Sequence, residues 1–529
     1  MRGRRGSFAL TALARSRIKK GGACAAPCSA APIPKGRYKM ETQRPSLTIL
    51  SDEAIEQILE ESLEILEDVG ITVEDQETLG ILGEMGAAIA RGERKAKIKR
   101  SMVESAISTV PRIFTLHGLD GTPRFRFGDG QIHFNPGSAA LFILDGATSE
   151  MRKPTLADVA KFVRLTDTLE NIEATSTGVV PGDVPQEVSD SLRLYISCLF
   201  STKPVVTGTF SAKGFAVMLD LLLARTGASS LGENPPAIFD VCPSSPLRWS
   251  ELGCHDLREC AQNSVPAQLI SMPLAGALAP MSLLASVVQH TAETLSGIVI
   301  HQAWTPGAPI IYGGSPALFD MRHSTSPMGA IETLMIDLAY AEVGKRLGLP
   351  TQAYLGMSDA KALDAQAGME TAMTVVVAAA GKVDFVSGPG MLNFENCQSL
   401  EKLILDNEIC GMARHFKRGL EPRGKTLGID AIKDGLKEGN FFTLDDTLRL
   451  YKEEAYYPGR VIDRKSSKEP GPVDTGRLGT EAAREVERRL AKYERPDLGE
   501  TCKSDLKSVM EEALAPYGLK DLAAKCLEL

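Results

Sequence analysis

The sequence predicts an α/β protein built on a (β/α)8 barrel, with helical additions at both ends. Between residues 131 and 399, eight short apolar runs each end in Gly, Pro, Ser or Asn. Successive runs begin roughly 30 to 42 residues apart, which is the length of a parallel strand plus its crossover helix. The runs are continuously apolar, as in strands buried on both faces. Eight such units are what a (β/α)8 barrel requires.

Residues 1–39 have a composition unlike the rest of the chain. They carry ten of the 59 Lys and Arg residues and no Asp or Glu. This is the composition of a transit peptide. Alternatively, the segment is an upstream extension from a wrongly assigned start codon, because ordinary sequence follows Met40. We leave it out of the fold prediction in either case. The remainder holds 49 basic against 67 acidic residues, which disfavours nonspecific nucleic-acid binding.

We expect residues 40–130 to form an amino-terminal helical layer. Ser51 is a candidate N-cap, with Asp52 and Glu53 in the first turn. Apolar residues then follow at helical spacing up to Gly70. Residues 71–116 continue as short helical and extended pieces.

The predicted barrel occupies residues 131–399. Its eight runs begin near Ile132, Ile172, Pro204, Ala237, Gln268, Pro309, Thr351 and Val383. Helical patterns lie between them, for example at 156–169, 188–200, 283–304 and 331–347. A nucleotide-binding doubly wound sheet is disfavoured, since neither G-x-G-x-x-G nor G-x-x-x-x-G-K-[ST] occurs.

Residues 400–529 are predicted to be mostly helical and to pack back on the barrel. They include a polar loop at 464–477 and a charged amphipathic helix at 478–493. No continuous apolar run approaches the roughly 18–20 residues of a bilayer span, so we expect no membrane association. The ten cysteines are sparse and irregularly spaced, which favours a reduced, cytoplasmic protein. Cys254, His255 and Cys260 lack a second ligand pair, so no metal is expected.

The candidate site lies at the carboxyl ends of the predicted strands, where barrel enzymes carry their chemistry. Small polar residues dominate these positions, and no Ser-His-Asp, Cys-His or H-E-x-x-H pattern can be assembled. Such a site favours chemistry done by positioning a partner or cofactor. Two loops carry charge, at 320–323 and 358–361. Asp359 could equally cap the next helix, and Asp320 could pair with Arg322.

Aromatic residues are only 5% of the chain, so their placement is informative. Phe134, Tyr312, Tyr354 and Phe385 fall in the first, sixth, seventh and eighth predicted strands, which are neighbours around a barrel. Aromatic faces gathered at a barrel mouth could hold a quaternary ammonium by cation–π attraction. The alternative is that they fill the barrel core.

One block of motifs resembles the trimethylamine methyltransferase family. It comprises Gly313-Gly314, Asp320-Met321-Arg322, the stretch Gly356-Met-Ser-Asp-Ala-Lys361, the stretch Asp364-Ala-Gln-Ala-Gly-Met-Glu370, and Val383-Asp384. The resemblance implies a (β/α)8 barrel. It also implies transfer of a methyl group from a methylamine or betaine to the Co(I) state of a separate corrinoid protein, with no cofactor tightly bound to this chain.

The resemblance also bears on the substrate. Met357 stands where the members that demethylate trimethylamine carry pyrrolysine. The chain therefore resembles the branch without pyrrolysine, which implies quaternary amines such as glycine betaine. The predicted catalytic residues are Met357 and Asp359. The predicted substrate-binding residues are Phe134, Asn135, Tyr312, Arg322, His323, Tyr354 and Phe385, with Arg322 expected to hold a betaine carboxylate.

Two alternatives remain open: a trimethylamine:corrinoid methyltransferase, and a barrel that binds a betaine without turning it over. The expected partners are a small quaternary amine and a corrinoid-binding protein, with homo-oligomer formation possible and neither nucleic acid nor membrane involved.

Overall fold

The computed structural model describes residues 41–424, 426–466 and 474–529. The chain divides into two units, Met1–Glu41 and Thr42–Leu529. The fold described below belongs to the second unit, and the predicted extension at 1–39 lies outside the described residues.

Eight parallel strands form the centre of this unit, in two sheets. Each of the eight predicted runs contains one of them, which confirms the α/β class. The first sheet has the order β15-β13-β11-β10-β9, and the second has the order β17-β18-β6. In chain order the strands are β6 His133–Asn135, β9 Thr175–Ser176, β10 Val205–Thr207, β11 Ala237–Val241, β13 Ala267–Leu269, β15 Ile310–Ile311, β17 Gln352–Ala353 and β18 Phe385–Ser387.

Backbone hydrogen bonds join the two sheets at both of their shared edges. After β15, the Tyr312 N–H donates to Pro350 O (2.9 Å), and the Gln352 N–H donates to Tyr312 O (3.1 Å). Before β9, the Glu173 N–H donates to Phe134 O of β6 (3.0 Å). Strands that are consecutive in the chain are therefore neighbours in space.

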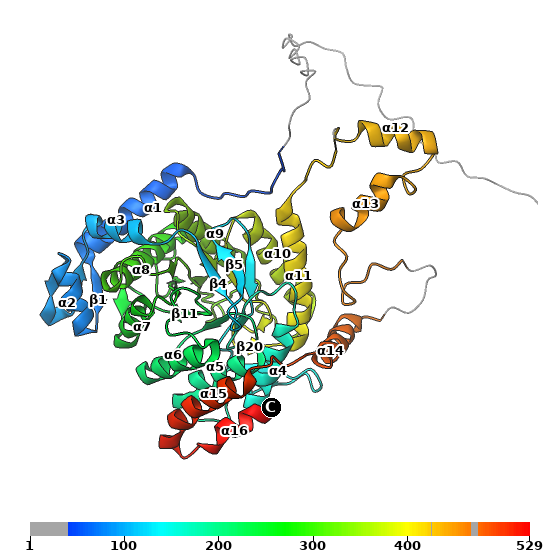
Figure 1. The fold of residues 1–529 in the computed structure, drawn as a ribbon. Helices are drawn as coiled ribbons and strands as arrows, with labels where there is room; N and C mark the ends of the chain where they lie inside the picture. The colour runs from blue at the N-terminus through cyan, green and yellow to red at the C-terminus, as the bar shows by residue number, and fades with distance from the viewer. Residues whose placement is uncertain (1–40, 425, 467–473) are drawn as a thin grey trace, which may run out of the picture. The chain divides into compact units, whose positions relative to one another are not determined.

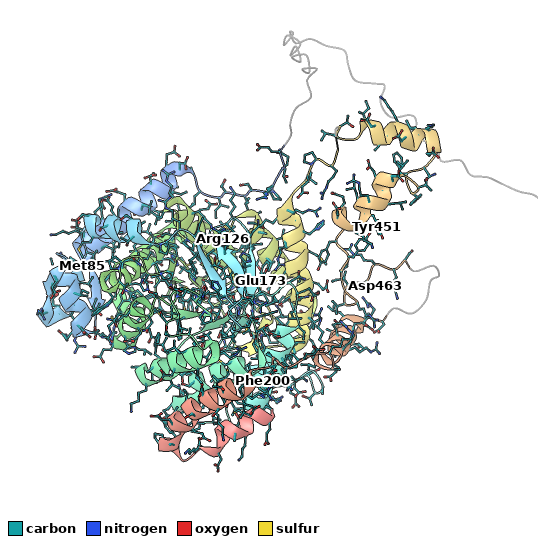
Figure 2. The ribbon with its side chains drawn as sticks, in the orientation of Figure 1. Met85, Arg126, Glu173, Phe200, Tyr451 and Asp463 are labelled. Carbon is teal, nitrogen blue, oxygen red and sulfur yellow. The ribbon has the colours of Figure 1, made fainter. Side chains whose placement is uncertain are left out.

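Helices surround these strands (Figure 1). Seven of them follow a strand in a βα unit, and α11 follows the last strand through a short hairpin. They are α4 Leu156–Asp167, α5 Ser189–Phe200, α6 Ala212–Thr226, α7 Glu251–Gln262, α8 Leu283–Trp304, α9 Ile331–Arg346, α10 Ala365–Ala380 and α11 Leu400–Arg418. Their side chains fill the space between helix and strand (Figure 2).

Helix α8 corrects one expectation. With 22 residues it has the length and apolar composition of a bilayer span, although three titratable side chains interrupt its apolar run: His290, Glu293 and His301. Within the protein, 83% of that stretch is buried, and α8 packs against α1 (Asp52–Glu64), α3 (Arg100–Thr109), α7 and α9. It is a core helix of this fold.

The amino-terminal region is more than the helical layer that was predicted. Beside α1, α2 (Gln76–Glu84) and α3, it contains the strands β1 Ile71–Val73, β2 Ala88–Ala90 and β3 Lys95–Lys97, which form a sheet with β12 Arg248–Trp249. The sequence predicted short helical and extended pieces over residues 71–116 but did not locate these strands, because three residues are too few to show an alternating pattern.

A hairpin, β4 Phe114–His117 with β5 Pro123–Phe127, closes one end of the space between the parallel strands. Three of its side chains, Leu116, Phe125 and Phe127, share one core cluster with a residue from each of five strand segments: Ala174, Val206, Ile238, Ile311 and Phe385. We call the strand face that contributes to this cluster the inner face. The hairpin lies in front of the strands in Figure 1.

A second hairpin lies beyond the carboxyl end of β18. Its strands are β19 Met391–Leu392 and β20 Cys397–Gln398, and β20 pairs with β7 (Phe142–Leu144), which pairs with β8 (Met151–Arg152). Residues 393–396 form its turn. This hairpin turn lies at the end of the strands where the site was predicted.

The described residues after 400 form the helices α11, α12 Ile429–Glu438, α13 Asp445–Glu454, α14 Arg477–Leu490, α15 Gly499–Leu514 and α16 Asp521–Glu528. Helix α14 coincides with the predicted amphipathic helix and packs on α11 and α4, while α15 packs on α6 and α5. Part of the predicted polar loop, residues 467–473, lies outside the described residues.

Candidate functional site

The centre of the site is a tyrosine–carboxyl pair between two strands of different sheets. The Tyr354 hydroxyl, just after β17, donates to Asp240 Oδ2 of β11 at 3.1 Å. Gln268 Nε2 of β13 donates to the other oxygen of Asp240 at 2.7 Å, and Gln268 Oε1 is buried with no hydrogen-bond partner. Burial raises the pKa of Asp240 to about 7 and holds the pKa of Tyr354 well above its usual range. The Tyr354 side chain is thus fixed at the strand ends.

A second carboxyl group reaches the same place from the turn of the β19–β20 hairpin. Burial, followed by the negative charge of Asp240, raises the pKa of Glu395 to about 8. Glu395 also influences the pKa of Tyr354. It is the third of three consecutive non-glycine residues with positive φ, namely Asn393 (51°), Phe394 (57°) and Glu395 (68°). For Phe394 and Glu395 this conformation costs about 1–2 kcal/mol each, so the turn is strained.

The motif block from which the family resemblance came holds this hairpin. The Ser358 N–H donates to Met391 O (3.1 Å), and the Asn393 N–H donates to Ala360 O (2.9 Å). Lys361 Nζ lies 4.0 Å from the centroid of the Phe394 ring. The segment 358–361 therefore fixes the position of the turn that carries Glu395.

Asp359, predicted to be catalytic, serves as an anchor in the structure. Its two oxygens accept hydrogen bonds from the N–H groups of Met328 (2.8 Å) and Gly329 (3.1 Å), in the loop before α9. Burial raises the pKa of Asp359 to about 6. It does not cap the next helix, because Asp364 caps α10. Glu370 of α10 accepts from the Asp359 N–H (2.9 Å), so this block ties together two helices and the hairpin.

A buried guanidinium lies at the carboxyl ends of β9 and β10. Arg193 of α5 is 1% exposed, donating from Nε to Thr177 O (2.9 Å) and from Nη2 to Thr177 Oγ1 (2.7 Å). The Phe210 ring centroid lies 5.5 Å from its Cζ. Arg193 forms no ion pair with a carboxylate in the described part of the chain. Burial lowers the pKa of Arg193 to about 10, and Asp190 and Tyr354 offset part of that shift.

The four predicted aromatic residues do not come together. Phe134 faces the helices, with Arg414 of α11 over its ring (5.9 Å). Tyr312 also faces outward, donating its hydroxyl to Thr291 Oγ1 of α8 (3.0 Å). Phe385 is on the inner face but lies in the core cluster, against Phe125 and Phe127. Tyr354 alone of the four meets the acidic groups, so the predicted aromatic cage is wrong.

Arg322, predicted to bind the carboxylate of a betaine, also lies away from the tyrosine–carboxyl centre. The Arg322 side chain is 82% exposed and pairs with Asp320 (2.7 Å), which confirms the alternative that the sequence left open. His323 lies on the same exposed loop, with Nδ1 3.2 Å from Asp320. The Arg322 hydrogen bonds hold the pKa of Asp320 far below its usual range. A charge already satisfied in solvent is a poor anchor for a substrate.

The two other predicted residues are buried near the strand ends. The Asn135 carboxamide Oδ1 accepts a hydrogen bond from Ser387 Oγ at 2.7 Å. Met357 is 1% exposed, and its Cε lies 3.1 Å from the place where a Cβ on Gly388 would be. A thioether in that position can pack but cannot donate a proton, and the catalytic role assigned to it stays a prediction.

Glycines at the strand ends are accounted for by packing within the chain. A Cβ on Gly314 would lie 2.3 Å from His290 Nε2, and one on Gly388 would lie 2.3 Å from Leu355 O. These glycines thus allow parts of this chain to approach one another. They are no evidence for a large partner.

Asp240, Glu395 and Arg193 were missed in the sequence. Asp240 had a usable signal, since it is the one charged residue in the apolar run Ala237–Val241. Arg193 is likewise a lone basic residue within a helix that is buried throughout. Glu395 had none, because a left-handed turn without glycine has no recognisable pattern.

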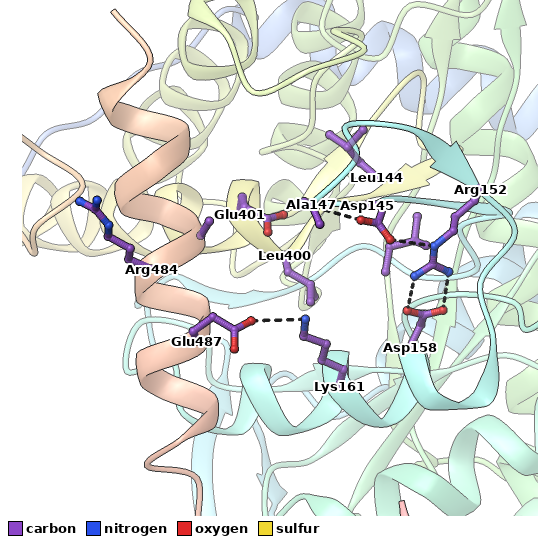
Figure 3. A pocket seen from close by; sticks show the side chains of 13 residues that line it. Leu144, Asp145, Ala147, Arg152, Asp158, Lys161, Leu400, Glu401, Arg484 and Glu487 are labelled. Atoms are coloured by element: carbon purple, nitrogen blue, oxygen red, sulfur yellow. Dashed lines mark hydrogen bonds and ion pairs between the residues drawn. The ribbon is translucent and has the colours of Figure 1, made fainter. Parts of the chain in front are cut away.

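A cavity at another place in the fold differs from the tyrosine–carboxyl centre, because most of its charged side chains are already paired. About 580 Å³ in volume, it lies between α4, the β7–β8 turn and α14. Five of its charged side chains pair with one another, as Figure 3 shows: Arg152 with Asp145 and Asp158, and Lys161 with Glu487. No lining side chain belongs to the tyrosine–carboxyl centre. Satisfied surface ion pairs of this kind offer little to a ligand.

Comparisons with known proteins agree with the motif block. A trimethylamine methyltransferase MttB from Desulfitobacterium hafniense strain DCB-2 is 29% identical over 438 residues, covering 82% of this chain and 87% of its own length. A glycine betaine methyltransferase from Desulfitobacterium hafniense strain Y51 is 30% identical over 370 residues, covering 69% and 77%. The solved Methanosarcina barkeri monomethylamine methyltransferase aligns with a TM-score of 0.46 at 13% identity, over 84% of this chain and 93% of that one.

The sequence model of the family described as "Trimethylamine methyltransferase (MTTB)" matches residues 19–515, nearly the full chain. This chain is a methyltransferase of the trimethylamine methyltransferase family.

Proposed function

We propose that this methyltransferase moves a methyl group from a quaternary amine of the betaine type to the Co(I) centre of a separate corrinoid protein. The observation that carries the proposal is the Tyr354–Asp240 pair at the strand ends. An aromatic ring backed by a carboxyl group attracts a cation through the ring quadrupole and through charge.

The chemistry matches the residues present. A quaternary ammonium already carries its positive charge and leaves as a neutral amine after losing a methyl group, so no proton donor is needed. The protein has to strip water from the cation and aim one methyl group outward. Met357, in place of a reactive electrophile, fits a donor that needs no activation. The corrinoid supplies the nucleophile that takes the methyl group.

A closed (β/α)8 barrel is the architecture that we propose for the eight strands. The hydrogen bonds across both edges of the two sheets support it, as does the core cluster fed by five strand segments from around the ring. In such a barrel the Tyr354–Asp240 pair would lie at the carboxyl-terminal mouth, which is the catalytic face of this fold.

Arg193 supports a substrate with a carboxylate. A buried guanidinium without an ion-pair partner is unfavourable, and a substrate carboxylate would supply that partner through charged hydrogen bonds. Tyr354 is electrostatically coupled both to Arg193 and to Asp240. A betaine, with its ammonium and carboxylate only a few bonds apart, would be held at both ends.

Calorimetric binding of glycine betaine and tetramethylammonium to the wild-type protein and to Arg193→Lys tests the proposal. We expect the wild type to bind both cations, and trimethylamine poorly. The lysine variant should lose about 10- to 100-fold in glycine betaine affinity, equivalent to ~1.5–3 kcal/mol for a charged hydrogen bond, and almost nothing for tetramethylammonium. Equal losses for both ligands would remove Arg193 from the site, and binding of neither ligand by the wild type would refute the proposed substrate.

A further inference from the structure

The turn that presents Glu395 holds three successive residues in strained backbone conformations. Three successive left-handed residues without glycine are rarely tolerated unless the surrounding structure holds them. The structure does hold them, through Ala360 O and through Lys361 over Phe394. In the described residues the Glu395 carboxylate itself accepts no hydrogen bond.

The groups around Glu395 come from several elements. Asp240 and Cys242 belong to β11 and the residue after it, Tyr354 follows β17, and Asp337 is on α9. Of these, Asp240 is the group whose negative charge, after burial, raises the pKa of Glu395. The nearby cation Lys361 is occupied by the Phe394 ring and by Asp359 O (2.7 Å).

An unsatisfied acceptor beside Asp240 points to an absent cation. Gln268 is fully buried, is held against Asp240 by its Nε2 group, and has an Oε1 without a partner. A buried acceptor without a donor is unfavourable, and the positive charge of a bound organic cation would relieve it.

Resting on the function proposed above, we infer that Glu395 is the second carboxylate of the quaternary-ammonium site, opposite Asp240, and that the segment Ser358–Lys361 exists to hold it there. Glu395 is then a substrate-positioning residue, and the motif block acts on the substrate through it. The ammonium binds the ionised carboxyls, so binding expels the protons that Asp240 and Glu395 carry in the free protein.

The test uses Glu395→Gln and, as a matched control, Glu401→Gln. Glu401 of α11 is another half-buried acid with a raised pKa, but its carboxyl group lies beside Gly146, away from Asp240. Tetramethylammonium and glycine betaine affinities are measured calorimetrically from pH 6 to 9, in buffers with different ionisation enthalpies. For the wild type we expect affinity to rise with pH up to about 8 to 9, with proton release on binding.

For Glu395→Gln we expect affinity to fall at least fivefold at pH 8.5, with less proton release and a flatter pH profile, while Glu401→Gln behaves as the wild type. A second variant, Glu395→Gly, separates binding from folding: glycine relaxes the turn, so its melting temperature should equal or exceed that of the wild type while its affinity falls.

An unchanged affinity and pH profile in Glu395→Gln, with the wild type still binding both cations, would overturn this inference and leave the proposed function standing. A wild type that binds neither cation would overturn both. A lower melting temperature in Glu395→Gly with unchanged affinity would show that Glu395 serves the fold only.

Discussion

At the scale of single residues, we expect Tyr354 to bind substrate and Tyr312 to stabilise the fold, although both are buried at strand ends. Tyr354 meets Asp240, whereas Tyr312 meets Thr291 between strand and helix. Tyr354→Leu should weaken betaine binding about five- to thirtyfold, equivalent to ~1–2 kcal/mol, because the ring is lost. Tyr354→Phe keeps the ring and should stay within a few-fold of the wild type.

Tyr312→Leu is the control for that experiment. It removes a ring of the same kind from the helix–strand interface, so it should lower the melting temperature and leave the affinity of the folded protein unchanged. Affinity and melting temperature are measured on all three variants. If Tyr354→Leu resembled Tyr312→Leu in both measurements, Tyr354 would be a packing residue.

The orientation of the aromatic residues shows where sequence reasoning fails at this scale. Phe134 and Tyr312 were correctly placed at strands, but a strand of two or three residues shows too little alternation to separate the inner from the outer face. The ion pair of Arg322 with Asp320 could be anticipated, because the two residues are close in the chain.

At the scale of elements, the segment Ser358–Lys361 of the motif block links α9, α10 and the β19–β20 hairpin by hydrogen bonds. Asp359→Asn leaves only one carbonyl oxygen for the N–H groups of Met328 and Gly329. We expect a loss of about 1–3 kcal/mol in the free energy of unfolding, since one buried N–H loses its acceptor. Denaturant titration measures this loss.

Asp364→Asn is the matched control, because Asn caps a helix about as well as Asp. It should be nearly neutral. Loss of methyl transfer in Asp359→Asn with unchanged stability would restore Asp359 to the catalytic role that the sequence suggested.

The elements themselves were more predictable than their contacts. All eight parallel strands and the helix at 477–490 were located, because apolar runs and helical spacing reflect burial directly. The β4–β5 and β19–β20 hairpins were not. Strands of two to five residues, with a turn that lacks glycine in the second hairpin, leave no period to detect.

At the scale of the whole molecule, we expect the raised pKa of Glu395 to lower the free energy of unfolding as pH rises. The folded pKa of Glu395 is raised to about 8, above its value of 4.5 when exposed. The folded state therefore retains a proton that the unfolded state has lost, and stability decreases between about pH 4.5 and 8. The difference in unfolding free energy between Glu395→Gln and the wild type should grow in favour of the variant over that window.

Comparing Glu395→Gln with the wild type separates the pH effect of Glu395 on stability from the pH effects of His290 and His301. Burial lowers the pKa of each of these histidines to about 3, so they destabilise the fold as pH falls below about 6.5 in both proteins alike. Urea titrations at pH 5, 6.5 and 8 measure the difference, and a difference independent of pH would mean that Glu395 is ionised throughout.

The central claim is methyl transfer from a quaternary amine. The most direct measurement mixes the purified protein with a reduced corrinoid protein and follows the Co(I) absorbance while glycine betaine or trimethylamine is added. We predict rapid conversion of Co(I) to methyl-Co(III) with glycine betaine and none with trimethylamine. Conversion with trimethylamine at a comparable rate, or none with any quaternary amine, would contradict the account.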